Sequence, residues 1–123
     1  MRVLIAEDEK KTRALLVEML RSFGCETVEA ASGYEAVKLV QEARPEVLLL
    51  DGLLPEMHGF EVARFVRSLA PEYHPKIVII TAVYKSQRYQ NEAKLQFGVD
   101  HYLVKPVTKD AVAAAVFGPE PKE

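Results

Sequence analysis

The sequence predicts an α/β protein in which helices cover both faces of a five-stranded parallel sheet. Five short apolar runs alternate with longer segments in which apolar residues recur at helical spacing. The segments between the runs are too long for hairpins, which favours parallel strands joined by helices. The chain has 123 residues, of which 49% are hydrophobic and 28% are charged, and this is typical of one globular domain.

The first two predicted strands flank a helix. Val3–Ala6 is apolar at every position, as expected for a strand that is buried on both faces. Apolar residues then recur at helical spacing from Leu15 to Phe23, and Gly24 is expected to end that helix. Thr27–Ala30 is shorter and less apolar, so we place it at an edge of the sheet.

The middle of the chain contains the clearest buried strand. Before it, Ser32 is predicted to cap a helix that runs to about Ala43, and Glu35 would complete a capping box. The strand Val47–Leu50 follows and ends directly on Asp51. A loop over residues 52–59 then leads into a helix with one apolar face, formed by Phe60, Ala63, Val66 and Leu69.

Two further strands and two helices are predicted in the last third. Ile77–Ile80 is the fourth strand, and Lys85–Phe97 is expected to be an unusually polar helix. Tyr102–Val104 is the fifth strand, and Asp110–Phe117 is a short last helix. We therefore expect one domain over residues 1–117, followed by a flexible tail at 118–123.

Charge and composition argue against several classes of protein. No apolar run approaches the ~20 residues that span a bilayer, so membrane insertion is not expected. The single cysteine, Cys25, excludes an internal disulfide framework and fits a reducing compartment such as the cytoplasm. The net charge of −2 argues against direct nucleic-acid binding, and Lys10, Lys11 and Arg13 are expected to form a solvated helix face. His58, His74 and His101 lack metal-ligand spacing and are expected at the surface or in loops.

Polar side chains stand where the predicted strands end. Ligands of open doubly wound sheets bind beyond the carboxyl ends of the strands. The side chains at these ends are Glu7, Asp8, Asp51, Thr81 and Lys105. Carboxylates ~4 Å apart repel by about 4 kcal/mol at an effective dielectric near 20, so such a cluster protonates, pairs with cations or holds a metal. Oxygen donors favour a hard ion such as Mg²⁺, and a cation, an ammonium and a hydroxyl together suit a phosphoryl group.

Four segments, each at a predicted strand end, closely resemble the receiver domain of bacterial two-component response regulators. They are residues 4–9 (LIAEDE), 51–59 (DGLLPEMHG), 81–82 (TA) and 98–106 (GVDHYLVKP). The resemblance extends from Arg2 to about Phe117. It implies a flavodoxin-like (βα)5 three-layer sandwich with the strand order 2-1-3-4-5.

The resemblance also implies a role for each residue of the site. Asp51 would accept a phosphoryl group from a phosphohistidine of a sensor histidine kinase or phosphotransfer protein. Lys105 and Thr81 would bind the phosphoryl oxygens, and Thr81 would move together with the aromatic switch residue Tyr102. Magnesium would be held by Asp8, Asp51 and the backbone carbonyl of Leu53, with Glu7 acting through bound water. The bond before Pro106 is expected to be cis.

Further expectations concern partners and output. The resemblance implies a downstream protein or output domain, and it allows a homodimer through the face formed by the fourth helix, fifth strand and fifth helix. The domain would be an acceptor rather than a turnover enzyme. Leu53 and Val83 are apolar where many members of the family carry polar groups, so we expect slow hydrolysis of the phosphoryl bond.

Two other functions remain open from the sequence. One is a Mg²⁺-dependent hydrolase of the haloacid dehalogenase type, which acts through an aspartyl phosphate. Such enzymes carry a second acid two residues after the nucleophile, where this chain has Leu53. The other is a receiver domain that binds proteins without being phosphorylated.

Overall fold

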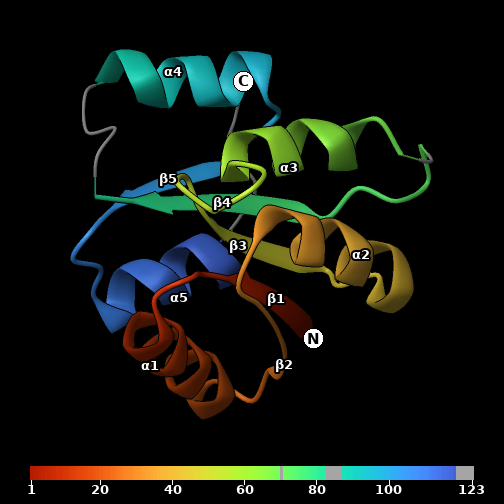
Figure 1. Ribbon diagram of the computed structural model, residues 1–123. Coiled ribbons are helices and arrows are strands. Elements are labelled where there is room, and N and C mark those ends of the chain that lie inside the picture. Colours follow the sequence, from red (N-terminus) through yellow and green to blue (C-terminus); the bar gives the residue numbers. More distant parts are fainter. Residues whose placement is uncertain (70, 83–86, 119–123) are drawn as a thin grey trace.

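Strands and helices alternate along the whole of the computed structural model, which describes residues 1–69, 71–82 and 87–118 (Figure 1). The elements are, in order, β1 (Arg2–Ala6), α1 (Lys10–Ser22), β2 (Glu26–Ala30), α2 (Gly33–Ala43), β3 (Val47–Asp51), α3 (Gly59–Arg67), β4 (Lys76–Thr81), α4 (Gln87–Gln96), β5 (His101–Val104) and α5 (Lys109–Phe117). The fold class predicted from the sequence is confirmed.

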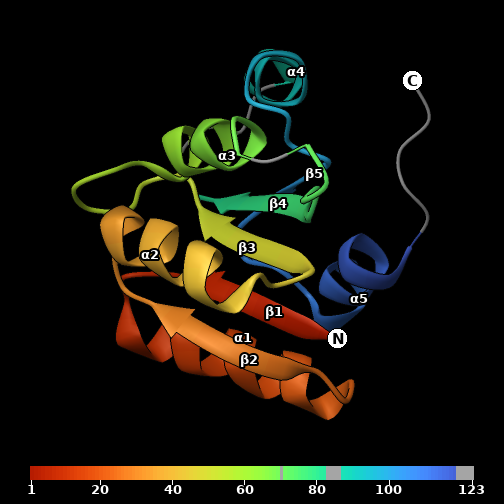
Figure 2. The ribbon, with the colours of Figure 1, turned by 90° about the vertical axis from the view of Figure 1, so that its right-hand side faces the viewer.

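The five strands form one parallel sheet in the order β2-β1-β3-β4-β5, as expected, and Figure 2 shows them stacked in this order. Val3 of β1 pairs with Thr27 on one side and with Val47 on the other. The weakly apolar strand β2 lies at an edge, as predicted, whereas β3 is buried along its whole length in the middle of the sheet.

Alternate residues of the strands face two separate cores. Helices α2, α3 and α4 cover one face of the sheet, and α1 and α5 cover the other (Figures 1 and 2). In β3, Leu48 and Leu50 point into the first core, and Val47 and Leu49 point into the second. Burial on both faces explains why the strands read as unbroken apolar runs.

Among the described residues, side chains cap three of the helices. Ser32 begins α2 by accepting a hydrogen bond from the N–H of Glu35 at 3.1 Å, as predicted. The carboxylate of Glu35 accepts from the N–H of Ala31 at 2.9 Å, one residue before the position expected for a capping box. Glu9 caps α1 and Thr108 caps α5 in the same way, so each of these helices has a fixed first turn.

Several expectations need correction or lie outside the described residues. His101, expected at the surface or in a loop, is a half-buried residue of β5. The polar helix α4 buries Ala93. Lys85, where this helix was expected to begin, lies outside the described residues. Val83 and tail residues 119–123 lie outside the described residues. Within the described ranges, no helix is long and apolar enough to cross a membrane.

Candidate functional site

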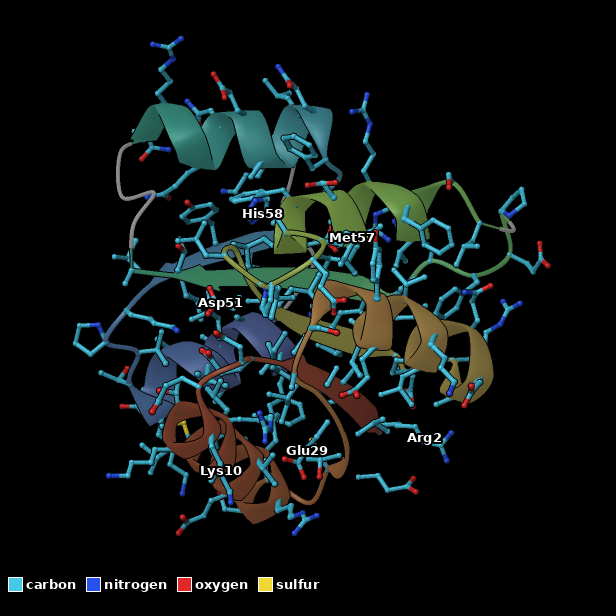
Figure 3. All side chains as sticks on the ribbon, in the orientation of Figure 1. Arg2, Lys10, Glu29, Asp51, Met57 and His58 are labelled. Atoms are coloured by element: carbon cyan, nitrogen blue, oxygen red, sulfur yellow. The ribbon has the colours of Figure 1, made fainter. Side chains whose placement is uncertain are left out.

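The carboxyl ends of three strands bring two acids and a lysine into contact. The Lys105 ammonium, just after β5, lies 2.5 Å from Oε1 of Glu7 and 3.2 Å from Oδ2 of Asp51. Glu7 follows β1 directly, and Asp51 is the last residue of β3. Figure 3 shows Asp51 at the end of the sheet, between the two layers of helices. The predicted meeting of these residues is therefore observed.

A third carboxylate completes an acidic group. Glu7, Asp8 and Asp51 each offer one oxygen, and these three oxygens all lie within 4.8 Å of one another. The side chains of Glu7 and Asp51 are only 2% and 10% exposed, whereas Asp8 is exposed. The oxygen-only donor set, open to solvent on one side, fits a hard divalent cation that keeps part of its water shell.

The contact between Glu7 and Lys105 and their burial shift the pKa of both groups. Burial raises the pKa of Glu7, and the hydrogen bonds from Lys105 and from the N–H of Glu9 only partly offset this rise. Burial by itself lowers the pKa of Lys105, but the hydrogen bond and charge of Glu7 and the charge of Asp51 outweigh it, so the pKa of Lys105 is raised. Lys105 therefore supplies a positive charge beside Asp51.

Asp51 is positioned by the loop that follows it. Its Oδ1 accepts a hydrogen bond from the N–H of Leu53 at 3.0 Å, which places residue 53 directly beside the carboxylate. A Cβ atom on Gly59 would lie 2.2 Å from the carbonyl oxygen of Asp51, so the start of α3 packs against β3 as closely as only glycine allows. The other oxygen, Oδ2, faces Lys105.

Thr81 lies next to Asp51 at the end of β4 and is fully buried. A Cβ atom on Gly52 would lie 3.3 Å from the Thr81 hydroxyl oxygen, so this hydroxyl lies against the residue that follows Asp51. The Thr81 carbonyl accepts a hydrogen bond from the N–H of Lys105 at 2.8 Å. Thr81 and Lys105 thus form adjoining parts of one wall of the site.

The predicted switch residue Tyr102 is 9% exposed and lies in β5. Its ring centroid is 6.3 Å from that of Phe60 in α3. The Lys105–Pro106 bond is cis, as predicted. The structure therefore places every predicted site residue at or near the same end of the sheet.

Arg13 makes contacts beside the site that the sequence did not reveal. We expected it on a solvated helix face, but its side chain is only 19% exposed. Its Nη1 donates a hydrogen bond to the carbonyl of Glu7 at 2.9 Å, and its Nε lies 3.2 Å from Oε1 of Glu29. Arg13 therefore ties the end of β1 to β2. The only sequence feature that could have indicated these contacts is its position in the first turn of a helix capped by an acid, and many solvent-exposed arginines occupy such positions.

Known proteins are similar to this chain over nearly its whole length. Residues 3–117 match the family model of the response regulator receiver domain. The polar-differentiation response regulator DivK of Brucella anthropi is 30% identical over 106 residues, which are 86% of this chain and 85% of DivK.

Solved structures of other proteins share the fold of this chain. The chemotaxis response regulator CheY4 of Vibrio cholerae superposes with a TM-score of 0.85 at 27% identity and covers 94% of this chain and 95% of its own. The receiver domain of the sensor histidine kinase PA1611 of Pseudomonas aeruginosa, solved with a magnesium ion coordinated in its active-site cleft, gives a TM-score of 0.80 at 26% identity, with coverages of 96% and 98%. From the family match, the shared fold and the acidic site at the strand ends, we conclude that this chain belongs to the response regulator receiver domain family.

Proposed function

We propose that this receiver domain accepts a phosphoryl group on Asp51 from a phosphohistidine of a sensor histidine kinase or phosphotransfer protein. The observation that carries the proposal is the contact of the Lys105 ammonium with both Glu7 and Asp51, beside the Asp8 carboxylate. A nucleophilic carboxylate, a fixed cation and a group of oxygen donors are the parts that phosphoryl transfer requires.

Each step of the transfer has a residue to support it. An Asp51 carboxylate oxygen forms a bond to phosphorus as the bond from phosphorus to the imidazole nitrogen breaks, and the histidine leaves with the electron pair of that bond. Lys105 then binds one phosphoryl oxygen, and the Thr81 hydroxyl donates a hydrogen bond to another. Thr81 shifts to make this hydrogen bond, and Tyr102 moves together with it. The movement of the two residues changes the surface that a downstream protein or output domain contacts.

A metal ion would be held by Asp8, Asp51 and the carbonyl of Leu53, with Glu7 contributing through water. We assign this role to Mg²⁺, which when bound would neutralise negative charge on the transferring phosphoryl group. The oxygen-only donors and the exposure of Asp8 support this assignment.

The site favours an acceptor over a turnover enzyme. The residue two positions after Asp51 is Leu53, which is 37% exposed and has an apolar side chain, so it cannot act as the second acid of a hydrolase. We propose a domain over residues 1–117 with a tail at 118–123, which works in the cytoplasm without contacting nucleic acid. Dimerisation, where it occurs, would use the face of α4, β5 and α5.

Incubation with acetyl phosphate and Mg²⁺, followed by intact mass spectrometry, tests the proposal. We expect a stable adduct of about 80 Da, the mass of one phosphoryl group. Asp51→Asn should abolish the adduct and a chelator should suppress it, whereas Asp110→Asn, which removes an exposed acid in the first turn of α5, should leave it unchanged.

Two outcomes would contradict the proposal. Continuous release of phosphate without an adduct would indicate the hydrolase. Neither an adduct nor release would indicate a domain that binds proteins without phosphorylation.

A further inference from the structure

A cavity of about 240 Å³ lies between α3 and α4, beside the acidic site but with different walls. Its apolar walls are the rings of Phe60 and Phe97 together with Ala93. The two ring centroids are 5.6 Å apart and the ring planes are tilted by 55°, so the rings form an angled aromatic corner. His58, labelled at the start of α3 in Figure 3, also lines the cavity. The space suits a ligand with a single ring or a short branched chain.

The charged lining of the cavity is acidic. Glu61 of α3 and Glu92 of α4 both line it. Within residues 1–69, 71–82 and 87–118, Glu61 makes no ion pair, and Glu92 pairs at 3.4 Å with Arg88, whose side chain is 84% exposed. An exposed pair of this kind contributes little and is easily exchanged. Both carboxylates are therefore available to a cation.

One of the two rings, Phe97, already lies close to a cation in this structure. The guanidinium carbon of Arg64 lies 5.9 Å from the centroid of the Phe97 ring. The face of an aromatic ring carries partial negative charge and draws ammonium and guanidinium groups within ~6 Å. The corner of two rings with two carboxylates thus has the chemistry of a site for an organic cation.

We propose that this cavity is a binding site for a small organic cation, a guanidinium or alkylammonium group carried on a single ring or short alkyl body. The apolar body would pack on the two rings and Ala93. The charged head would lie at the carboxylates of Glu61 and Glu92. A neutral or anionic ligand of the same shape would lack the favourable contacts with the carboxylates of Glu61 and Glu92.

Occupancy of the cavity is coupled to the phosphoacceptor, and this part of the inference depends on the proposed function. Gly52, which also lines the cavity, directly follows Asp51. A Cβ atom on Gly52 would lie 3.1 Å from Cε2 of Phe60 and 3.3 Å from the Thr81 hydroxyl. Phe60 also neighbours Tyr102. A ligand that fixes Phe60 therefore acts on the residues that the proposed switch moves, and coupling between two such sites is reciprocal.

Binding is tested on the full, unphosphorylated chain by ¹⁵N–¹H NMR titration with benzamidine, a single-ring guanidinium-like cation. Benzamide and benzoate are the neutral and anionic controls of the same shape. We expect millimolar binding of benzamidine, as for other ligands of this size, with shifts centred on Gly52, Phe60 and Ala93. Equal binding of the three compounds, shifts elsewhere, or no saturation would overturn the proposal.

Substitutions give opposite expectations on the two sides of the cavity. Glu61→Gln and Glu92→Gln should each weaken benzamidine binding about threefold to fivefold, the range of a partly exposed ion pair. Arg64→Gln removes the guanidinium that lies against the Phe97 ring and should tighten binding. Glu42→Gln, an exposed acid on α2, is the matched control and should change nothing. Unchanged affinity in both cavity glutamate variants would contradict the placement of the charged head.

Coupling is tested by the rate at which acetyl phosphate labels the protein with and without saturating benzamidine. We expect a change of at least twofold in the parent chain and none in a Glu61→Gln, Glu92→Gln variant. Binding without any change in rate would overturn the coupling alone. Absence of labelling in both samples would overturn the proposed function, while the NMR result would still decide whether the cavity binds cations.

Discussion

Arg67 connects α3 to the opposite end of the sheet from the acidic site, and its removal should destabilise the fold. Its Nη2 lies 2.8 Å from Oδ2 of Asp100, and its Nε and Nη1 donate to the carbonyls of Gly98 at 3.0 Å and Pro75 at 2.7 Å. The same Asp100 oxygen accepts a hydrogen bond from the N–H of Ile77 at 2.8 Å. One side chain thus joins the end of α3, the start of β4 and the approach to β5.

The burial of this pair sets the size of the effect. The Arg67 and Asp100 side chains are 16% and 19% exposed, so they lie nearer to a buried pair than to a surface pair. Breaking a buried pair costs about 3–5 kcal/mol, and an exposed pair contributes about 0–1 kcal/mol. For Arg67→Met, which keeps most of the apolar stem, we expect a loss of about 2–3 kcal/mol, since Asp100 keeps the bond from Ile77.

Urea denaturation followed by far-UV circular dichroism measures this loss, because the chain has no tryptophan. A loss of this size should also lower the midpoint of thermal unfolding by about 10 °C for a domain of this length. The matched control is Arg88→Met, whose pair with Glu92 is 84% and 42% exposed, and we expect it to cost less than about 0.5 kcal/mol. Equal costs for the two variants, or a cost below about 1 kcal/mol for Arg67→Met, would refute the reasoning from burial.

Three further perturbations have defined outcomes. Burial raises the pKa of Tyr73 to about 12, and its hydroxyl donates to the carbonyl of Pro45 at 2.7 Å. The unfolded chain therefore loses this proton at a lower pH than the folded chain. The free energy of unfolding should fall by up to about 2–3 kcal/mol as the pH rises from about 10 towards 12. Urea titrations of Tyr73→Phe over this pH range should lack this part of the fall, and the same pH dependence in both proteins would contradict the assignment. Lys76 donates a hydrogen bond to the carbonyl of Gly118 at 2.8 Å, just beyond the end of α5. Lys76→Met should therefore lower the free energy of unfolding by about 1–2 kcal/mol, and amide hydrogen exchange should speed up in α5 before the other elements. An equal increase in exchange throughout the domain would argue against a contact that stabilises α5 locally. Because the apolar Leu53 cannot orient a water by hydrogen bonding, the phosphoryl group should persist for minutes or longer in Mg²⁺ buffer and be lost faster in Leu53→Asn; a half-life of seconds in the parent chain would refute this.

The sequence predicted the fold well because the strands are buried on both faces. Val47–Leu50 and Ile77–Ile80 have no polar residue, and a strand covered by helices on both faces buries such a run along its whole length. The acidic site was predictable for a related reason, since Glu7 directly follows the apolar run Val3–Ala6 and Asp51 directly follows Val47–Leu50. His101 was misplaced because a polar residue at the start of a short edge strand interrupts no apolar pattern.

Contacts between residues that are far apart in the chain could not be predicted from the sequence. Arg67 and Asp100 are 33 positions apart, and neither residue differs in its local pattern from charged residues that stay in solvent. Arg13 was assigned to solvent for the same reason. The cavity at Phe60 and Phe97 depends on how α4 packs beside α3, and a helix that buries little has an orientation that periodicity cannot predict.

The contact of Lys105 with Glu7 joins residues 98 positions apart, and the contact with Asp51 joins residues 54 positions apart. A nascent chain therefore has its acids long before it has their counter-ion. Until β5 joins the sheet, Glu7 and Asp51 lack the Lys105 ammonium that contacts them both in the folded chain. We infer that closing the edge of the sheet is the event that creates chemical competence, so fragments released early during synthesis would be inert towards a phosphate donor.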